Sequence, residues 1–424
     1  MLLETQSFLS SINESSDQLK KIRTKCSTRL QEVEFTDEAF EYLQLKELLS
    51  CALQKAPVSS VSKEALLEHV FPECEKSYVT FVNGQFRADL SDCASLPKGS
   101  FCISLEQAMK VFGTFVHNTF TKTCKEERDY FALFNAAFHQ EGAFLYIPPK
   151  TVCTAPIQIL SVIDTAERDS WMMPRLHLFA GAQSEASVAY RTVCLRGERY
   201  FYNNLFDIAI EDGAKVTASV DDLGLPPSES WLFDAFRVAL KPNATFKGCQ
   251  LAGSEKSRRD WNIAINGSNV NVELSGLWLL DGKKEAHVNV VMDHQEPYSR
   301  SLQLFKGVLN DAARSGFQGK IVVGKRATKT ESYQINKNLM LSDLAEANSK
   351  PNLEIMTSDV KASHGATIGQ LDERQLFYLK SRGFNEHEAK RCMINGFCHE
   401  IVEKLFLDSQ ARHFAEVLLQ YVRI

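Results

Sequence analysis

The feature that most constrains the fold of this chain is a series of short β-type segments between residues 143 and 323. Within each segment, Val, Ile, Phe and Thr alternate with polar residues, which is the pattern of a strand with one buried face. The segments are Ile157–Ile163, Leu176–Phe179, Ala186–Val193, Phe206–Ile210, Val216–Val220, Phe236–Leu240, Trp261–Ile265, Val270–Leu280, Val288–Met292 and Lys320–Val323. So many short alternating segments predict a mainly β core.

A weak tetrapeptide repeat runs through the same region. Each copy has a turn residue, then Ala, any residue and an apolar residue. The copies are Glu185-Ala186-Ser187-Val188, Gly213-Ala214-Lys215-Val216, Asn243-Ala244-Thr245-Phe246 and Gly365-Ala366-Thr367-Ile368. The first three begin at 185, 213 and 243, so they are 28 and 30 residues apart. This period favours the coils of a β-solenoid, although a β-sandwich also accommodates strands of this length.

Both ends of the chain have helical patterns instead. Residues 1–55 are expected to be helical, including an apolar stripe over Asp37–Leu53 with Thr36 or Asp37 as its N-cap. Two further short helices are expected at Leu105–Asn118 and Asp129–Ala137. The predicted organisation is a mostly helical region at 1–140, a β core at 141–368 and a helical region at 369–424.

Three helices are predicted in the C-terminal region. Asp372 is placed to cap the first, and Gly383 is placed to stop it. Asn385 and Glu388 have the spacing of a capping box for the second helix, and Ser409 is expected to cap the third. The apolar stripe of the second helix is expected to be Ala389, Cys392, Met393, Gly396, Phe397, Ile401 and Leu405.

Composition excludes several classes of protein. Hydrophobic residues make up 44% of the chain and charged residues 24%, which argues against disorder. The net charge of -5 comes from acidic and basic residues mixed along the chain, so no dedicated nucleic-acid surface is expected. The start of the chain lacks the pattern of a signal peptide, and no apolar run approaches the roughly 18 residues of a membrane helix. We therefore expect a cytoplasmic protein that binds neither nucleic acid nor membrane.

Cysteine spacing and the common catalytic motifs give little support for intrinsic chemistry. The 11 cysteines are scattered without a C-x-x-C pair, which argues against a zinc site and a ferredoxin-type cluster. No phosphate-binding loop, dinucleotide fingerprint, nucleophile elbow or H-E-x-x-H motif occurs. The sequence therefore predicts neither an enzyme nor an intrinsic cofactor.

Four features are candidates for chemistry, each with an ordinary structural alternative. Ser363-His364-Gly365, expected in a turn, offers an imidazole to a metal or hydrogen-bonds the backbone. His287 with Asp293, His294 and Glu296 forms a loose metal pattern, for which structural roles are favoured. Cys392 and Cys398 are expected to be two core thiols on different faces of a helix. The basic cluster of Lys320, Lys325, Arg326 and Lys329 is expected to be a solvated strand face.

The C-terminal third carries several distinctive segments: Pro351-Asn352-Leu353-Glu354-Ile355, Ser358 to Gly369, Leu376-Phe377-Tyr378-Leu379 and Ser381-Arg382-Gly383. With these segments the chain closely resembles the SufB/SufD family of iron–sulfur cluster assembly proteins. Phe317 to Ile321, Asn338 to Asp343 and Gly142 to Pro148 extend the resemblance. Gly365 stands where SufB-type chains carry Glu, so the chain resembles the SufD type. The family often has Cys at the position of Ala362.

The resemblance implies a right-handed parallel β-helix between helical ends and a role as a non-catalytic scaffold. It implies a heterodimer with a SufB-type paralogue along the β-helix and a SufC-type ATPase on the C-terminal helices. The candidate partner-binding residues there are Phe377, Tyr378, Arg382, Phe397 and Ile401. His364 matches the family histidine at the SufB interface, where it would contact a transient iron–sulfur cluster. A β-helix carbohydrate-active enzyme and an independent iron–sulfur carrier are the alternatives.

Overall fold

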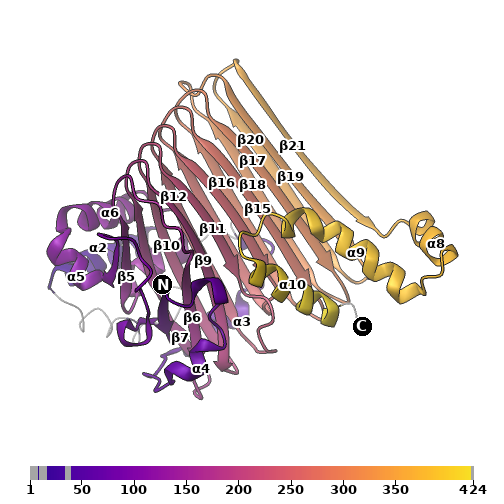
Figure 1. Ribbon diagram of the computed structural model, residues 1–424, viewed down its shortest axis with the longest axis horizontal. Helices are drawn as coiled ribbons and strands as arrows, with labels where there is room; N and C mark the ends of the chain where they lie inside the picture. Colours follow the sequence, from indigo (N-terminus) through magenta and orange to yellow (C-terminus); the bar gives the residue numbers. More distant parts are fainter. Residues whose placement is uncertain (1–7, 9–16, 34–39, 422–424) are drawn as a thin grey trace.

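The computed structural model describes residues 8, 17–33 and 40–421, and its core is a parallel β-solenoid of about 8 turns (Figure 1). From β8 onward, successive strands alternate between two sheets, and each strand up to β19 pairs in parallel with the strand two places after it. Each coil therefore contributes one strand to each of the two sheets. The mainly β solenoid expected from the sequence is confirmed, and the β-sandwich is excluded.

The solenoid consists of two sheets, and helices lie before and after it in the sequence. In spatial order the first sheet contains β20 (Glu346–Ile355), β18 (Arg314–Val323), β16 (Glu285–His294), β14 (Lys256–Ile265), β12 (Trp231–Leu240), β10 (Tyr200–Ile210), β8 (Arg175–Ala180), β5 (Gly142–Ile147) and β4 (Phe101–Ser104), with β1 (Gln54–Lys55) and β7 (Ser170–Met172) beside it. The second contains β21 (Val360–Gln370), β19 (Thr330–Met340), β17 (Arg300–Leu309), β15 (Asn271–Leu280), β13 (Thr245–Ala252), β11 (Lys215–Asp221), β9 (Glu185–Arg196), β6 (Ile157–Asp164), β2 (Tyr78–Val82) and β3 (Gln85–Phe86). The helices are α2 (Asp17–Glu32), α3 (Lys46–Ser50), α4 (Lys63–Leu67), α5 (Leu105–Val111), α6 (Gly113–Glu126), α7 (Tyr130–Phe138), α8 (Glu373–Ser381), α9 (Glu386–Val402) and α10 (Asp408–Tyr421).

The inside of the solenoid is a continuous apolar core. Alternate residues of both sheets point inward and are almost completely buried, as the two-residue period of a strand requires. Aromatic residues stack between neighbouring coils, with Phe236 and Trp261 at 4.1 Å between ring centroids. Stacking of this kind makes each coil depend on its neighbours for burial, so the coil at the end of the stack has one unfilled side.

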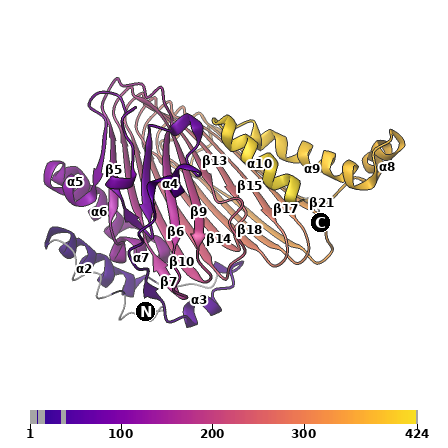
Figure 2. The same cartoon turned by 60° about the horizontal axis from the view of Figure 1, so that its bottom comes forward.

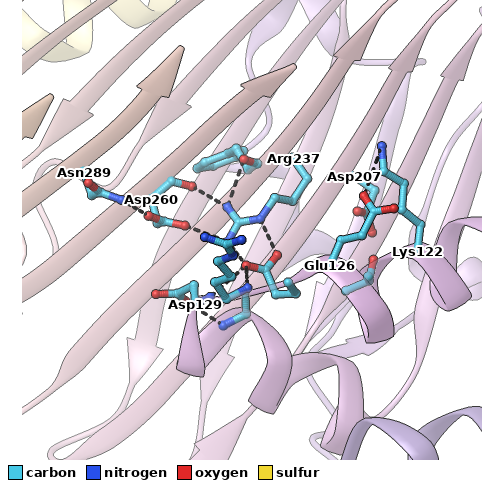
Figure 3. Close-up of polar contacts among 12 residues, drawn as sticks. Lys122, Glu126, Asp129, Asp207, Arg237, Asp260 and Asn289 are labelled. Atoms are coloured by element: carbon cyan, nitrogen blue, oxygen red, sulfur yellow. Dashed lines mark hydrogen bonds and ion pairs between the residues drawn. The ribbon is translucent and has the colours of Figure 1, made fainter. Parts of the chain in front are cut away.

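The N-terminal helices α2, α3, α5, α6 and α7 cover the outer face of the first sheet, whereas α4 packs on the second sheet. Every residue of α7 is buried, and its aromatic side chains pack with Trp171, Phe201 and Phe233 of the sheet. An ion network anchors this layer (Figure 3): Arg237 bonds to Glu127 at 2.7 Å and to Asp260 at 2.6 Å. Although burial alone would raise the pKa of Asp260, Arg237 and Arg258 lower it to about 2. Asp260 is therefore ionised at neutral pH, and the ion pairs of Arg237 join the helical layer to the sheet.

The C-terminal helices cover the outer face of the second sheet. Apolar side chains of α9 and α10 pack on outward residues of β13, β15, β17 and β19. The Tyr421 hydroxyl donates hydrogen bonds to the carbonyls of Leu280 and Val308, at 2.8 and 3.2 Å. Figure 2 shows this helical layer and the N-terminal one over different parts of the solenoid. Within the described part of the chain, no helix is long and apolar enough to cross a membrane.

The coil period and the strand lengths differ from the sequence-based expectation. Lys215 pairs with Glu185 and with Thr245, a spacing of 30 residues on both sides. In this register residue 213 is level with residue 183, so the repeat copy that begins at 185 starts two residues too late to match the copy that begins at 213. The copy that begins at 365 lies within β21 and not in a turn. Most strands also begin earlier than predicted, because their first halves bury polar residues such as Arg259 and Asp234.

Several helical predictions are also corrected. The apolar stripe predicted over Asp37–Leu53 yields only α3 in its described part, and its predicted caps lie outside the described residues. Leu105–Asn118 is split at Phe112 into two helices, α5 and α6. Ser409 is the second residue of α10 and not its cap; its hydroxyl donates to Glu73 at 2.6 Å. The predicted capping box of α9 is confirmed, as is the N-cap of α8 at Asp372.

Candidate partner interface at the last coil

The last coil leaves two strand edges without a partner. Among the described residues, β20 pairs only with β18, and β21 pairs only with β19. The far edge of each strand therefore presents backbone N–H and C=O groups that no other strand of this chain satisfies. Figure 1 shows both strands at the end of the stack. A long unpaired edge is a template for pairing with another chain, so this end of the solenoid is the first candidate for a partner interface.

His364 lies in the middle of this last coil. It was expected in a turn, but it is the fifth residue of β21 and is exposed. In the strand register it pairs with Gln334 of β19, which is buried inside the solenoid. Side chains in register on parallel strands point to the same face, so His364 faces the solenoid interior at its open end. The imidazole is thus placed where a stacked partner would cover it.

The side chains around His364 are small. On β21, Ala362 and Ala366 share its face. On β20, Pro351 is the register partner of Gly319, and both belong to the inward-facing set of the first sheet. A partner can approach this part of β21 closely, because the two nearest side chains on the same face of the strand are methyl groups.

Beneath the last coil, strands β17 and β19 of the second sheet contribute polar side chains to the core, while β18 of the first sheet still contributes apolar ones. Ser301 and Ser332 share a hydrogen bond of 2.6 Å, and Gln334 donates to Gln303 at 2.9 Å. Asn338 donates to Asn336 at 2.9 Å on the same strand. We call this set the polar ladder: Ser301, Gln303, Ser332, Gln334, Asn336 and Asn338. Sequence reasoning missed it, although the alternation of Ser332, Gln334, Asn336 and Asn338 was a visible signal.

The outward side chains near this end form ion pairs between neighbouring coils. Lys361 bonds to Glu331 at 3.0 Å, and Lys329 bonds to Asp359 at 2.9 Å. Lys320 and Arg326 of the predicted basic cluster likewise have carboxylate partners, Glu354 and Glu296. The predicted cluster is solvent-accessible, but it is not a strand face: only Lys320 lies on a strand, β18, whereas Lys325, Arg326 and Lys329 lie in the turn before β19.

The candidate partner-binding residues of the C-terminal helices differ in their exposure. Phe377 and Tyr378 of α8 are exposed by 74% and 56%, and the Arg382 guanidinium lies 5.1 Å from the Tyr378 ring centroid. Phe397 is half-buried beneath Lys306, which donates to its carbonyl at 2.8 Å. Ile401 is fully buried against the sheet and does not reach the surface. Of these candidate residues, Phe377 and Tyr378 of α8 are therefore the exposed aromatic ones.

The position of α8 is set by its termini. Asp372 accepts hydrogen bonds from the backbone N–H groups of Arg374 and Gln375. At the other end Gly383 has φ +98, and Phe384 N–H bonds to the Leu379 carbonyl at 3.3 Å, which is a Schellman motif. No residue of α8 is buried. The helix is therefore well formed but projects from the molecule, as Figure 1 shows.

The buried face of α9 is rotated from the predicted stripe. Its buried residues are Ala389, Ile394, Cys398 and Ile401. Cys392 is exposed, so it is not the core thiol that was predicted, whereas Cys398 is. Cys392 lines a pocket of about 560 Å³ between the α8–α9 turn and α10, together with Arg382, Arg391 and Leu419.

The loose metal pattern around His287 does not assemble. His287 and His294 are seven residues apart on β16, so they point to opposite faces of the sheet. His294 shares a hydrogen bond of 2.9 Å with Ser301, and His287 lies under Tyr42. Burial lowers the pKa of His287 to about 3 and that of His294 to about 4, so both are neutral core residues. Within the described residues, no three His, Cys, Asp or Glu side chains gather as metal ligands.

Two protein-family models match this chain. Residues 162–397 match the family described as "SUF system FeS cluster assembly, SufBD core domain", and residues 5–159 match "SufBD protein N-terminal region". The first match covers the solenoid from the end of β6 through most of α9.

Individual proteins agree with the family match. An iron–sulfur cluster assembly SufBD family protein of Synechocystis is 28% identical over 399 residues, which are 88% of this chain and 84% of that protein. The iron–sulfur cluster assembly protein SufD of Escherichia coli is 32% identical over 231 residues, 54% of each chain. A SufBD family protein of Mycobacterium tuberculosis is 28% identical over 272 residues, 57% of this chain and 66% of that protein. The chain belongs to the SufBD family of iron–sulfur cluster assembly proteins.

Proposed function

We propose that this chain is the SufD-type scaffold of a SufBCD-type complex, without catalytic activity of its own. Its last coil pairs with the last coil of a SufB-type paralogue, and its C-terminal helices bind a SufC-type ATPase. A transient iron–sulfur cluster forms at the paired coils as the cargo of the complex. The main support for the proposal is the open last coil: β20 and β21 each have an unpaired edge, and β21 contains one histidine, His364, that faces the interior.

The unpaired edges favour another β-solenoid as the partner. A solenoid with its own open last coil offers two strand edges at matching separation, so both edges of this chain gain hydrogen bonds together. The small side chains around His364 allow such stacking without a clash. A helical partner would satisfy neither edge.

The donor set of the last coil fits a shared cluster site. A neutral imidazole is a known ligand of iron–sulfur clusters, but thiolates are the usual ones. The chain has no cysteine between Cys249 and Cys392, so β20 and β21 contribute none. Ala362, two residues before His364, takes the place of a thiol that relatives often carry. His364 is therefore the side chain of β21 suited to an iron ion, and thiolate ligands must come from the partner.

The exposed face of α8 is proposed to bind the ATPase. We expect Phe377→Glu to weaken binding of the SufC-type subunit by about tenfold or more, because an exposed aromatic anchor is replaced by a charge. The affinity is measured by titration calorimetry. Gln375→Glu adds the same charge on the same helix and should bind as the native chain does. Equal affinity of both variants and the native chain would remove α8 from the interface.

The proposed function is tested by co-purification with the cognate SufB-type and SufC-type chains. The tagged native chain should retain both partners, and the complex should form a cluster when iron and sulfide are supplied. His364→Ala should retain both partners and lose the cluster absorbance. A native chain that purifies alone, or an H364A complex with full absorbance, would contradict the proposal. Point variants are preferable to truncation, because α9 and α10 cover apolar residues of the second sheet.

A further inference from the structure

The residue that pairs in register with His364, Gln334, has a buried amide oxygen without a hydrogen-bond partner. The side chain of Gln334 is completely buried, and its Oε1 atom accepts no hydrogen bond. Buried polar atoms in native proteins are nearly always paired, so such an atom calls for an explanation. Its position in the register supplies one, because Gln334 is the direct β19 neighbour of His364.

The amide of Gln334 is held in one place. Its Nε2 atom donates to Gln303 Oε1 at 2.9 Å, one coil deeper in the solenoid. Across the interior, Gly319 leaves room for this amide, since a Cβ atom there would lie 2.1 Å from Gln334 Nε2. Because Nε2 is engaged with the deeper coil, Oε1 is the atom of this amide that has no partner in the isolated chain.

His364 has few other acceptors on its face. Ala362 and Ala366, its neighbours on the same face of β21, have no polar side-chain atoms. An imidazole that binds a metal through one nitrogen almost always donates its other ring N–H to a fixed acceptor. Gln334 Oε1 provides such an acceptor, and it is buried and preoriented.

We propose that Gln334 is the positioning residue of His364. When a partner covers the last coil, the His364 ring rotates toward the polar ladder and donates one N–H to Gln334 Oε1. The lone pair of the other ring nitrogen then faces the interface, in the form that binds iron. This inference rests on the proposed function, since it assigns a supporting residue to the same site. Gln334 itself touches neither cluster nor partner.

The test uses the assembled complex with ¹⁵N-histidine in this chain only. The native complex should show a solvent-protected ring N–H resonance that disappears in His364→Ala. Gln334→Met has a similar size but no acceptor, and it should lose that resonance and about 10- to 100-fold in cluster affinity. Gln334→Glu restores an acceptor oxygen and should recover the resonance. Ser332→Ala removes a different hydrogen bond of the polar ladder and should leave the resonance and the cluster unchanged.

The outcomes distinguish a failure of the positioning role of Gln334 from a failure of the proposed function. If His364→Ala removes the cluster while Gln334→Met keeps both the resonance and the cluster, the positioning role is wrong and the proposed function stands. If Gln334→Met and Ser332→Ala lower cluster affinity equally, Gln334 acts only through stability, and the inference is overturned. If His364→Ala keeps the cluster, the proposed function itself has failed.

Discussion

Replacing Arg259 by Met should destabilise the solenoid by about 3–5 kcal/mol, the expected cost of removing one partner from a buried ion network. Arg259 bonds to Asp222 at 2.7 Å and to Asp234 at 2.8 Å, and all three side chains are at most 1% exposed. The substitution leaves two carboxylates in the interior with no cation. The change is measured as the loss in the free energy of unfolding, from urea titrations followed by circular dichroism.

A matched control separates this effect from the loss of any arginine. Arg326 also bonds to a carboxylate of the solenoid, Glu296, but its side chain is 74% exposed. Arg326→Met should therefore change stability by less than about 1 kcal/mol. Adding Asp222→Asn and Asp234→Asn to Arg259→Met should recover part of the loss, because the uncompensated charges are removed. Equal effects of both arginine variants would contradict a special role for the buried network.

Replacing Ala366 by Arg should abolish pairing with the SufB-type paralogue while the chain stays folded. Ala366 is exposed on the last coil and faces the interior side, next to His364. In the isolated chain the new side chain extends into solvent, but in a paired complex its charge would be buried without a partner, which is costly. The expected result is a loss of co-purification and an unchanged circular dichroism spectrum.

The neighbouring residue provides the control for this prediction. Thr367 is also exposed, but it pairs with Lys337 and therefore points to the outer face of the sheet. Thr367→Arg adds the same side chain one position away and should leave pairing intact. If Thr367→Arg blocks pairing and Ala366→Arg does not, the partner contacts the outer face and not the open end.

The solenoid could be predicted because most coils follow simple alternation. In β12, for example, Phe236, Val238 and Leu240 point inward with Arg237 between them, and the strand was found. Strand β19 inverts this pattern, since Gln334 and Asn336 are buried whereas Ile335 is 41% exposed. A search for alternating apolar residues overlooks such a strand. Contacts such as Arg237 with Glu127, 110 residues apart, carry no local signal at all.

The candidate site was only partly predictable. The motif around His364 identified this residue as a candidate. The local sequence suggested a turn, because Gly365 follows His364 and glycine is more common in turns than in strands. Only the register shows that His364 belongs to an edge strand and stands above Gln334. Helical periodicity likewise placed Cys392 and Ile401 on one stripe, but the sheet beneath α9 buries Ile401 and leaves Cys392 exposed.

The central claim is that the open edges of β20 and β21 pair with another solenoid. Hydrogen exchange of the backbone amides, measured with and without the SufB-type paralogue, tests it most directly. Amides of 346–355 and 360–370 that point away from the stack should exchange fast in the isolated chain and become protected in the complex. Protection confined to the outer faces of the sheets or to the helices, with both edges still exchanging fast, would contradict the claim.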